Sequence, residues 1–143
     1  MSHDLKTHDP SQISIGFAGR QISSGRADEF CTTAYNEPLY TTVVSPDGEV
    51  TRVKSNNRSA KITLTLKSTS AGHKLLTQLY GIGQISVNGS DIGEFQLRDR
   101  NGGLVEHAEK AWISKAPDNA NAKDVSDRAW ELECSYLVRE VEA

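Results

Sequence analysis

The sequence of 143 residues predicts a mainly β fold, an antiparallel two-sheet β-barrel or sandwich with one short flanking α-helix. The dominant local pattern is an alternation of apolar and polar residues with period 2, in segments separated by turn residues. Only one segment has the spacing of an amphipathic helix. The length suits one modest core, and no repeat or long linker divides the chain, so we treat residues 1–143 as a single domain.

The clearest alternation lies in Ala60–Lys67. Ile62, Leu64 and Leu66 alternate there with lysine and threonine, so one face of the strand is aliphatic and the other polar. We therefore expect the three aliphatic side chains to be buried and the threonines between them to be more exposed.

A second alternating segment covers residues 129–138, with Leu137 as its one exception. Seven further strands are predicted at residues 13–17, 28–35, 39–44, 48–54, 84–87, 94–98 and 104–115. The last of these is long for one strand, so we expect a bend or bulge near residues 107–109. Turn sequences separate the strands, namely SPDG at 45–48, NG at 88–89 and DRNGG at 99–103.

The helix is predicted within residues 68–81, with about three turns at most. Ser68, Thr69 or Ser70 can cap its N-terminus. Gly81 stands where a left-handed residue commonly follows a helix. The apolar stripe consists of Leu75, Leu76, Leu79 and Tyr80. Residues 117–128 are polar and rich in small side chains, which predicts an exposed loop.

Residues 1–12 are polar, and we expect them to form a flexible N-terminal lead without the apolar core of a secretion signal. Residues 137–143 are expected to form a rather acidic C-terminal extension whose place in the fold the pattern leaves open. No apolar run is long enough to span a membrane. A net charge of −3 argues against nucleic-acid binding driven by counterion release.

The motifs of catalysis and of metal or cofactor binding do not occur in the sequence, so we expect no catalytic residue, no metal and no cofactor. Cys31 and Cys134 lie far apart and are expected to be reduced thiols. His73 and His107 have no neighbour that would mark a general base. Both tryptophans, at 112 and 130, stand in alternating strands and are expected to anchor the core.

One long segment carries a family resemblance. Residues 47–76, DGEVTRVKSNNRSAKITLTLKSTSAGHKLL, join a DGE turn, a basic strand, an S-N-N-R-S linker, an I-T-L-T-L strand and a T-S helix start. Gly19-Arg20, A-W-I at 111–113 and W-E-L-E at 130–133 follow the same pattern. In this order of pieces the chain resembles the tail tube proteins of contractile-tailed bacteriophages, a family of phage structural proteins.

The resemblance implies the fold of the type VI secretion tube subunits and a structural role without enzymatic activity. Members of the family form six-membered rings, which stack into a hollow inner tube through which DNA leaves. The expected location is the virion tail, assembled in the cytoplasm of the bacterial host. The expected partners are further copies of the chain, the tail sheath protein, the tape measure protein, and the baseplate and terminator proteins, with transient passage of DNA and no membrane.

Residues 40–55 are predicted to form an extended hairpin with a proline-containing tip, an apolar stem and a basic return. A solvated hairpin is the plain interpretation, and the family resemblance favours an arm that reaches the adjacent ring. The residues assigned to this contact are Tyr40, Val43, Val44, Pro46, Asp47, Arg52, Lys54 and Arg58.

A lumen that passes DNA should present polar and acidic side chains, so that phosphate finds no partner. Glu29, Glu131 and Glu133 lie on the polar faces of predicted strands and suit such a wall. Lys61 and Lys67 do not suit it, because they would attract phosphate unless neighbouring carboxylates neutralise them.

Three alternatives stay open. A tail terminator or a baseplate adaptor of the same fold would be made in few copies and would cap the tube. A carbohydrate-binding β-sandwich would use Trp112 or Trp130 as a platform. An enzyme is the least favoured, because no pair of residues forms an acid–base or nucleophile arrangement.

Overall fold

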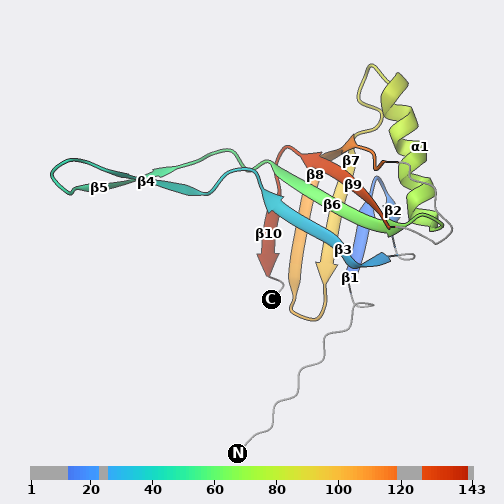
Figure 1. The fold of residues 1–143 in the computed structure, drawn as a ribbon, viewed down its shortest axis with the longest axis horizontal. Helices are drawn as coiled ribbons and strands as arrows, with labels where there is room; N and C mark the ends of the chain where they lie inside the picture. The colour runs from blue at the N-terminus through green and yellow to red at the C-terminus, as the bar shows by residue number, and fades with distance from the viewer. Residues whose placement is uncertain (1–12, 23–25, 119–126, 142–143) are drawn as a thin grey trace, which may run out of the picture.

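The computed structural model describes residues 13–22, 26–118 and 127–141, with the backbone alone for 26–29. The described part holds ten strands and one helix (Figure 1). The strands are β1 (Ile13–Phe17), β2 (Arg20–Gln21), β3 (Arg26–Tyr35), β4 (Tyr40–Val44), β5 (Val50–Lys54), β6 (Ala60–Lys67), β7 (Gly93–Asp99), β8 (Leu104–Lys115), β9 (Asp127–Cys134) and β10 (Val138–Val141), and the helix is α1 (Ala71–Ile85). The prediction of a mainly β fold with two antiparallel sheets and one helix is confirmed.

The larger sheet has the strand order β2-β1-β7-β8-β9-β6-β3, and every pairing in it is antiparallel. Strand β10 also pairs with β8, along its first half, while β9 pairs with the second half of the same strand. The sheet curves around the core, and α1 packs beside it (Figure 1). Strands β4 and β5 form a separate two-stranded sheet that projects from the body.

The core lies on the inner face of the curved sheet. Ile62, Leu64 and Leu66 are fully or almost fully buried, whereas Thr63 and Thr65 are half-buried, so the predicted register of β6 is confirmed. Ten other apolar side chains from the strands, one just after β2, one from α1 and one from the β9–β10 link complete the core: Ile15, Phe17, Ala60, Phe95, Leu97, Ala108, Ala111, Trp130, Leu132, Cys134, Ile22, Leu76 and Leu137. Burial of this surface is the main stabilising term of the fold.

The helix is longer than predicted. Ser70 caps its N-terminus by accepting a hydrogen bond from the backbone N–H of His73 at 3.1 Å. The C-terminus lies at Ile85 and not at residue 80, so the strand predicted at residues 84–87 is wrong. A Cβ at Gly83 would stand 2.9 Å from a carboxylate oxygen of Asp91, so the glycine makes room for the next loop to pack on the helix.

The predicted strand 129–138 divides into β9 and β10. Trp130 and Cys134 face the core as expected, but the alternation ends at Cys134. Tyr136 is 57% exposed, and Leu137, the exception in the pattern, is buried instead. The backbone N–H of Leu137 donates to the carbonyl of Arg58 at 3.0 Å, which fixes this change of direction.

The irregularity predicted near residues 107–109 is confirmed as a bulge between Ala108 and Ala111. Ala108 pairs with Phe95 and Ala111 with Gly93, so three residues of β8 span two of β7. The extra residue reverses the alternation, and Ala108 and Ala111 both face the core. Trp112 therefore lies half-buried on the outer face, opposite Glu133, which corrects the expectation that it anchors the core.

The C-terminal residues Val138–Val141 add a strand that the sequence pattern did not identify. The predicted N-terminal lead at 1–12 and most of the predicted loop at 117–128 lie outside the described residues, and Asp127 and Arg128 belong to β9. Among the described residues, no helix is both long and apolar enough to cross a membrane.

Candidate functional site

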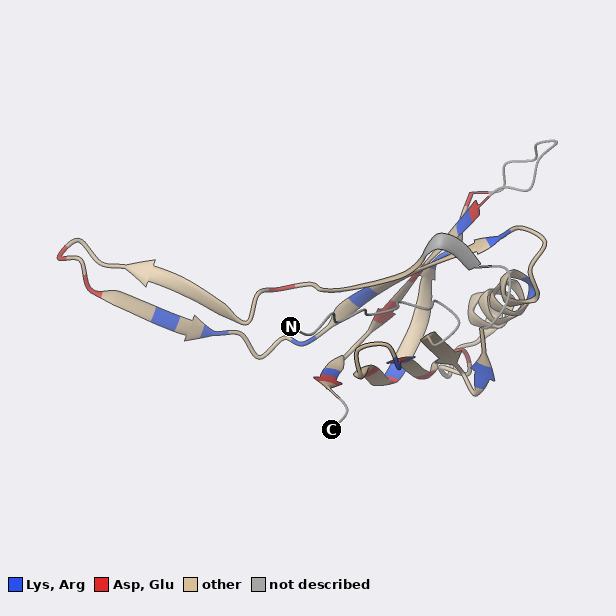
Figure 2. Cartoon of the chain, turned by 90° about the horizontal axis from the view of Figure 1, so that it is seen from below, with Lys and Arg blue, Asp and Glu red and all other residues tan. Residues whose placement is uncertain are grey.

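The β4–β5 hairpin forms a two-stranded sheet of its own, apart from the larger sheet. All ten residues of its two strands are exposed, and the arm points away from the barrel (Figures 1 and 2). One side carries only threonine and valine, at positions 41, 43, 51 and 53. Val43 and Val53 are 53% and 51% exposed there. A two-stranded sheet without a covered face is marginal in water, so this arm is a candidate contact surface.

The tip of the hairpin is an acidic turn. The Ser45 hydroxyl and the backbone N–H of Glu49 both donate to Oδ1 of Asp47. These two hydrogen bonds, that of Ser45 first, lower the pKa of Asp47, so this carboxylate stays ionised at mildly acidic pH. Gly48 has a φ of 89°, a left-handed conformation that glycine adopts without strain.

The second side of the hairpin becomes basic toward the body. The guanidinium of Arg52 lies 4.0 Å from the ring centre of Tyr40 on the opposite strand, a cation–π contact. Lys54 is exposed opposite the same tyrosine. Tyr40 and Val44 are 39% and 62% exposed.

Arg58 stands at the base of the arm and not along it. Its guanidinium lies 4.4 Å from the ring centre of Tyr35, and its Nη2 donates to the carbonyl of Glu37 at 3.0 Å. The Ser55 hydroxyl donates to the Glu37 carboxylate at 2.8 Å, which ties the two ends of the arm together. Arg58 therefore orients the hairpin on the barrel.

The outer faces of β6 and β9 form a continuous polar surface, which we call the polar wall. It consists of Lys61, Thr63, Thr65 and Lys67 on β6 and Asp127, Glu131 and Glu133 on β9. Lys61 Nζ lies 3.1 Å from Glu131, and Lys67 Nζ lies 2.6 Å from Asp127. Both lysines thus have a carboxylate partner, so the wall carries no unpaired lysine. These are the neighbouring carboxylates that the sequence analysis required to neutralise Lys61 and Lys67.

The three glutamates predicted for the lumen do not share one environment. Glu131 is half-buried in its pair with Lys61, whereas Glu133 on the same face is exposed. Glu29 lies in β3, and its side chain is outside what the structure describes. The structure therefore brings Glu131 and Glu133 together on the polar wall.

The sequence analysis did not identify a cluster of hydrogen-bonded polar side chains inside the body of the fold. Glu106 is 3% exposed, and it accepts hydrogen bonds from the Thr33 hydroxyl at 2.7 Å and from Arg139 Nε at 3.2 Å. Tyr35 donates its hydroxyl to the carbonyl of Leu137 at 2.8 Å. These bonds join β3, β8 and β10 near the base of the hairpin, so the cluster fixes the body from which the arm projects. The only sequence signal was an acidic residue on the apolar face of a strand.

The titratable core residues have structural partners. His73 Nδ1 accepts the indole N–H of Trp130 at 3.1 Å, and burial, with the charge of Arg128, lowers the pKa of His73. Burial raises the pKa of the Cys134 thiol, and no disulfide joins it to Cys31. Trp130 is 2% exposed and so offers no sugar platform. Among the described residues, no three His, Cys, Asp or Glu side chains gather as a metal site would require.

The comparison with known proteins decides the family. The model of the bacteriophage PhiTE tail tube protein matches residues 13–140. The chain belongs to this tail tube family. A relative from Pseudomonas phage KPP10, structural protein ORF10, is 25% identical over 136 residues, which are 91% of this chain and 79% of that protein. The resemblance in the sequence is thus confirmed, and the chain has a structural role of the tail tube type.

Solved structures with the same fold come from other contractile systems. The tube-terminating cap of the anti-feeding prophage gives a TM-score of 0.61 at 10% identity, over 99% of this chain and 95% of that one. A chain of the sheath–tube complex of the extracellular contractile injection system PVC, in its extended state, gives 0.60 at 11% identity, with coverages of 94% and 92%. Its sheath/tube terminator gives 0.62 at 11% identity, with 98% and 99%. These likenesses establish the tail tube fold of the chain.

Proposed function

We propose that this chain is the subunit of a phage tail inner tube, in which hexameric rings stack and DNA passes through the lumen during ejection. The observation that carries the proposal is the β4–β5 arm, whose ten strand residues are all exposed in the single chain. In a stack, each arm lies on the adjacent ring, and burial of its valines stabilises the contact.

Further exposed apolar residues support an assembled state. At the C-terminal end of α1, Ile85 is 84% exposed and Val87 is 101% exposed. Strands β2 and β3 lie at the two ends of the strand order, so the sheet leaves open edges that neighbouring subunits can cover. The subunit works in the virion tail after assembly in the host cytoplasm, with the tail sheath protein outside the tube and the tape measure protein within. Baseplate and terminator proteins bind its two ends.

The polar wall lines the lumen in this proposal. Its lysines are paired, and Glu133 adds an exposed negative charge that each subunit of a ring repeats. Such a wall repels phosphate weakly and offers it no cation. Glu131→Lys combined with Glu133→Lys should leave tubes intact but slow DNA ejection in low salt, with the delay reduced as salt rises. Ejection at the native rate in low salt would remove the polar wall from the lumen and leave the tube assignment standing.

Deletion of the tip residues 45–48, with a two-residue turn in their place, tests the role of the arm. We expect a folded subunit that still forms rings but stacks poorly, as counted by negative-stain electron microscopy. The matched control replaces the exposed Gln78 of α1, away from the hairpin, with alanine. Tubes of native length from the tip deletion would contradict the proposed stacking role.

A tail terminator is the second candidate, because two of the structures with this fold are a tube-terminating cap and a sheath/tube terminator. The copy number in purified virions separates the two roles. A tube subunit should be among the most abundant proteins of the tail, whereas a terminator should be present as about one ring.

A further inference from the structure

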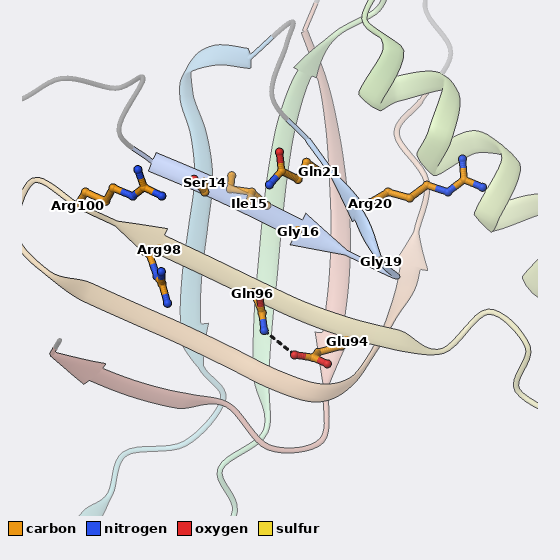
Figure 3. A pocket seen from close by; sticks show the side chains of 10 residues that line it. All are labelled: Ser14, Ile15, Gly16, Gly19, Arg20, Gln21, Glu94, Gln96, Arg98 and Arg100. Atoms are coloured by element: carbon orange, nitrogen blue, oxygen red, sulfur yellow. Dashed lines mark hydrogen bonds between the residues drawn. The ribbon is translucent and has the colours of Figure 1, made fainter.

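A basic hollow lies on the outer face of the sheet at β1, β2 and β7 (Figure 3). Its volume is about 430 Å³. Gly16 forms part of its floor without a side chain, and Gln96 lies opposite Gly16 in the strand register. Arg98 and Arg100 stand at one end, and Arg20 lies at the other end with its side chain directed away from them.

The arginines give this hollow an excess of positive charge. Glu94 is the one carboxylate in its lining, and it accepts a hydrogen bond from Gln96 at 2.6 Å. Among the described residues, no carboxylate pairs with Arg20, Arg98 or Arg100. Guanidinium groups bind carboxylates through paired, directional hydrogen bonds, so the pair Arg98 and Arg100, with Arg20 at the far end, suits an acidic segment.

The same chain carries an acidic segment without a partner. Asp47 and Glu49 stand at the tip of the hairpin, beyond the reach of the body (Figure 2). The hydrogen bonds that Asp47 accepts from Ser45 and from the backbone of Glu49 both go to Oδ1. Among the described residues, no cation pairs with the side chain of Glu49.

Tip and hollow also lie at opposite sides of the molecule. The arm leaves from β3, at one end of the strand order, whereas β1 and β2 are at the other end (Figure 1). One chain therefore cannot fill its own hollow, and a contact between two copies would be head-to-tail. When two copies bind in this way, one hairpin tip and one hollow stay unoccupied at the two ends of the pair. Further copies can bind there, so the contact propagates from copy to copy.

We propose that the hollow lined by Arg20, Arg98 and Arg100 receives the acidic hairpin tip, Asp47 and Glu49, of a second copy of this chain in the adjacent ring. This proposal rests on the proposed stacking of rings and names the surface on which the arm docks. The valine stem of the arm supplies apolar contact, and the ion pairs at the tip select the correct site and orientation. Stacking should therefore weaken as salt rises.

Reciprocal charge reversal tests the docking. Arg98→Glu alone and Glu49→Arg alone should each shorten the tubes at least about fivefold. One exposed ion pair changes an equilibrium constant by up to about fivefold, and every subunit of a ring contributes one such pair to the stacking equilibrium. The double variant should recover most of the native length. Lys74→Glu reverses an exposed charge on α1 and serves as the matched control, with native tubes expected.

The readouts are tube length in negative stain, single-ring content by sedimentation and folding by circular dichroism. The docking would be overturned if the single variants build tubes of native length. It would also be overturned if the tubes of the double variant are no longer than those of the single variant with the shorter tubes. In either case, tubes formed by the wild type would still uphold the proposed function. A wild type that forms neither rings nor tubes would overturn both. If Arg98→Glu misfolds, Arg100→Glu replaces it. Native tubes from Arg98→Glu with weaker retention of DNA would assign the hollow to nucleic acid instead.

Discussion

Replacement of Leu64 by alanine should lower the free energy of unfolding by about 3–4 kcal/mol. Leu64 has no exposed surface and lies between Cys31 of β3 and Trp130 of β9. The change removes three carbon atoms, and their transfer to water costs about 2.4 kcal/mol at about 0.8 kcal/mol each. Because β6 is hydrogen-bonded along both edges, the neighbouring strands cannot close the gap, and the cavity adds about 1 kcal/mol.

Urea unfolding followed by tryptophan fluorescence measures this loss, at a protein concentration too low for assembly and with the slope against urea unchanged. Thr65→Ala is the matched control on the outer face of the same strand. It removes a half-buried side chain and should cost at most about 1 kcal/mol. A loss below about 1 kcal/mol for Leu64→Ala, or equal losses in the two variants, would refute the assignment of the inner face as the core.

Three further outcomes are expected. Gly93→Ala should destabilise the fold by about 1–3 kcal/mol in urea unfolding, because its Cβ would stand 2.7 Å from the backbone of a neighbouring turn, whereas Gly102→Ala has open space and should be near neutral. The pKa of His73 is lower in the folded chain than in the unfolded one, so the unfolded state takes up the proton first as pH drops. The free energy of unfolding should therefore fall below about pH 6.5. His73→Gln should make it depend less on pH. Arg58→Ala should speed proteolysis within the hairpin, while Lys54→Ala should not, because Arg58 contacts Tyr35 and Glu37 at the base of the arm and Lys54 lies on the exposed strand β5.

Most strands could be predicted because one face of each is buried and the other faces solvent, which produces an alternation of apolar and polar residues. The predictions were wrong where tertiary packing overrode a local sequence preference. Gly81 and Gly83 resemble helix terminators, yet the helix continues because the next loop packs against it at Asp91. Trp112 faces outward because one extra residue in β8 reverses the alternation, and no sequence pattern specifies the position of such a bulge to the residue.

The candidate site was predictable in part. The arm was marked by its turn chemistry and by the family resemblance, whereas its orientation depends on Arg58 and Tyr35, which meet only in the folded chain. The pairing of Lys61 with Glu131 depends on the register of β6 against β9, strands that are far apart in the sequence. The hollow at Arg98 was missed because its arginines come from segments that look like ordinary polar strand faces.

The position of β9 in the sheet has a consequence for synthesis on the ribosome. β6 pairs with β3 and β9, and β8 reaches β6 only through β9, so the sheet consists of two separate pieces until β9 is present. β9 is the next-to-last strand of the chain, and its pairings are long-range in sequence, which makes them late and slow to form. A nascent chain therefore cannot complete its sheet before nearly all of it has been translated. If subunits assemble as proposed, incomplete chains lack the complete sheet that a neighbouring copy would contact, so the order of the strands would keep truncated products out of the assembly.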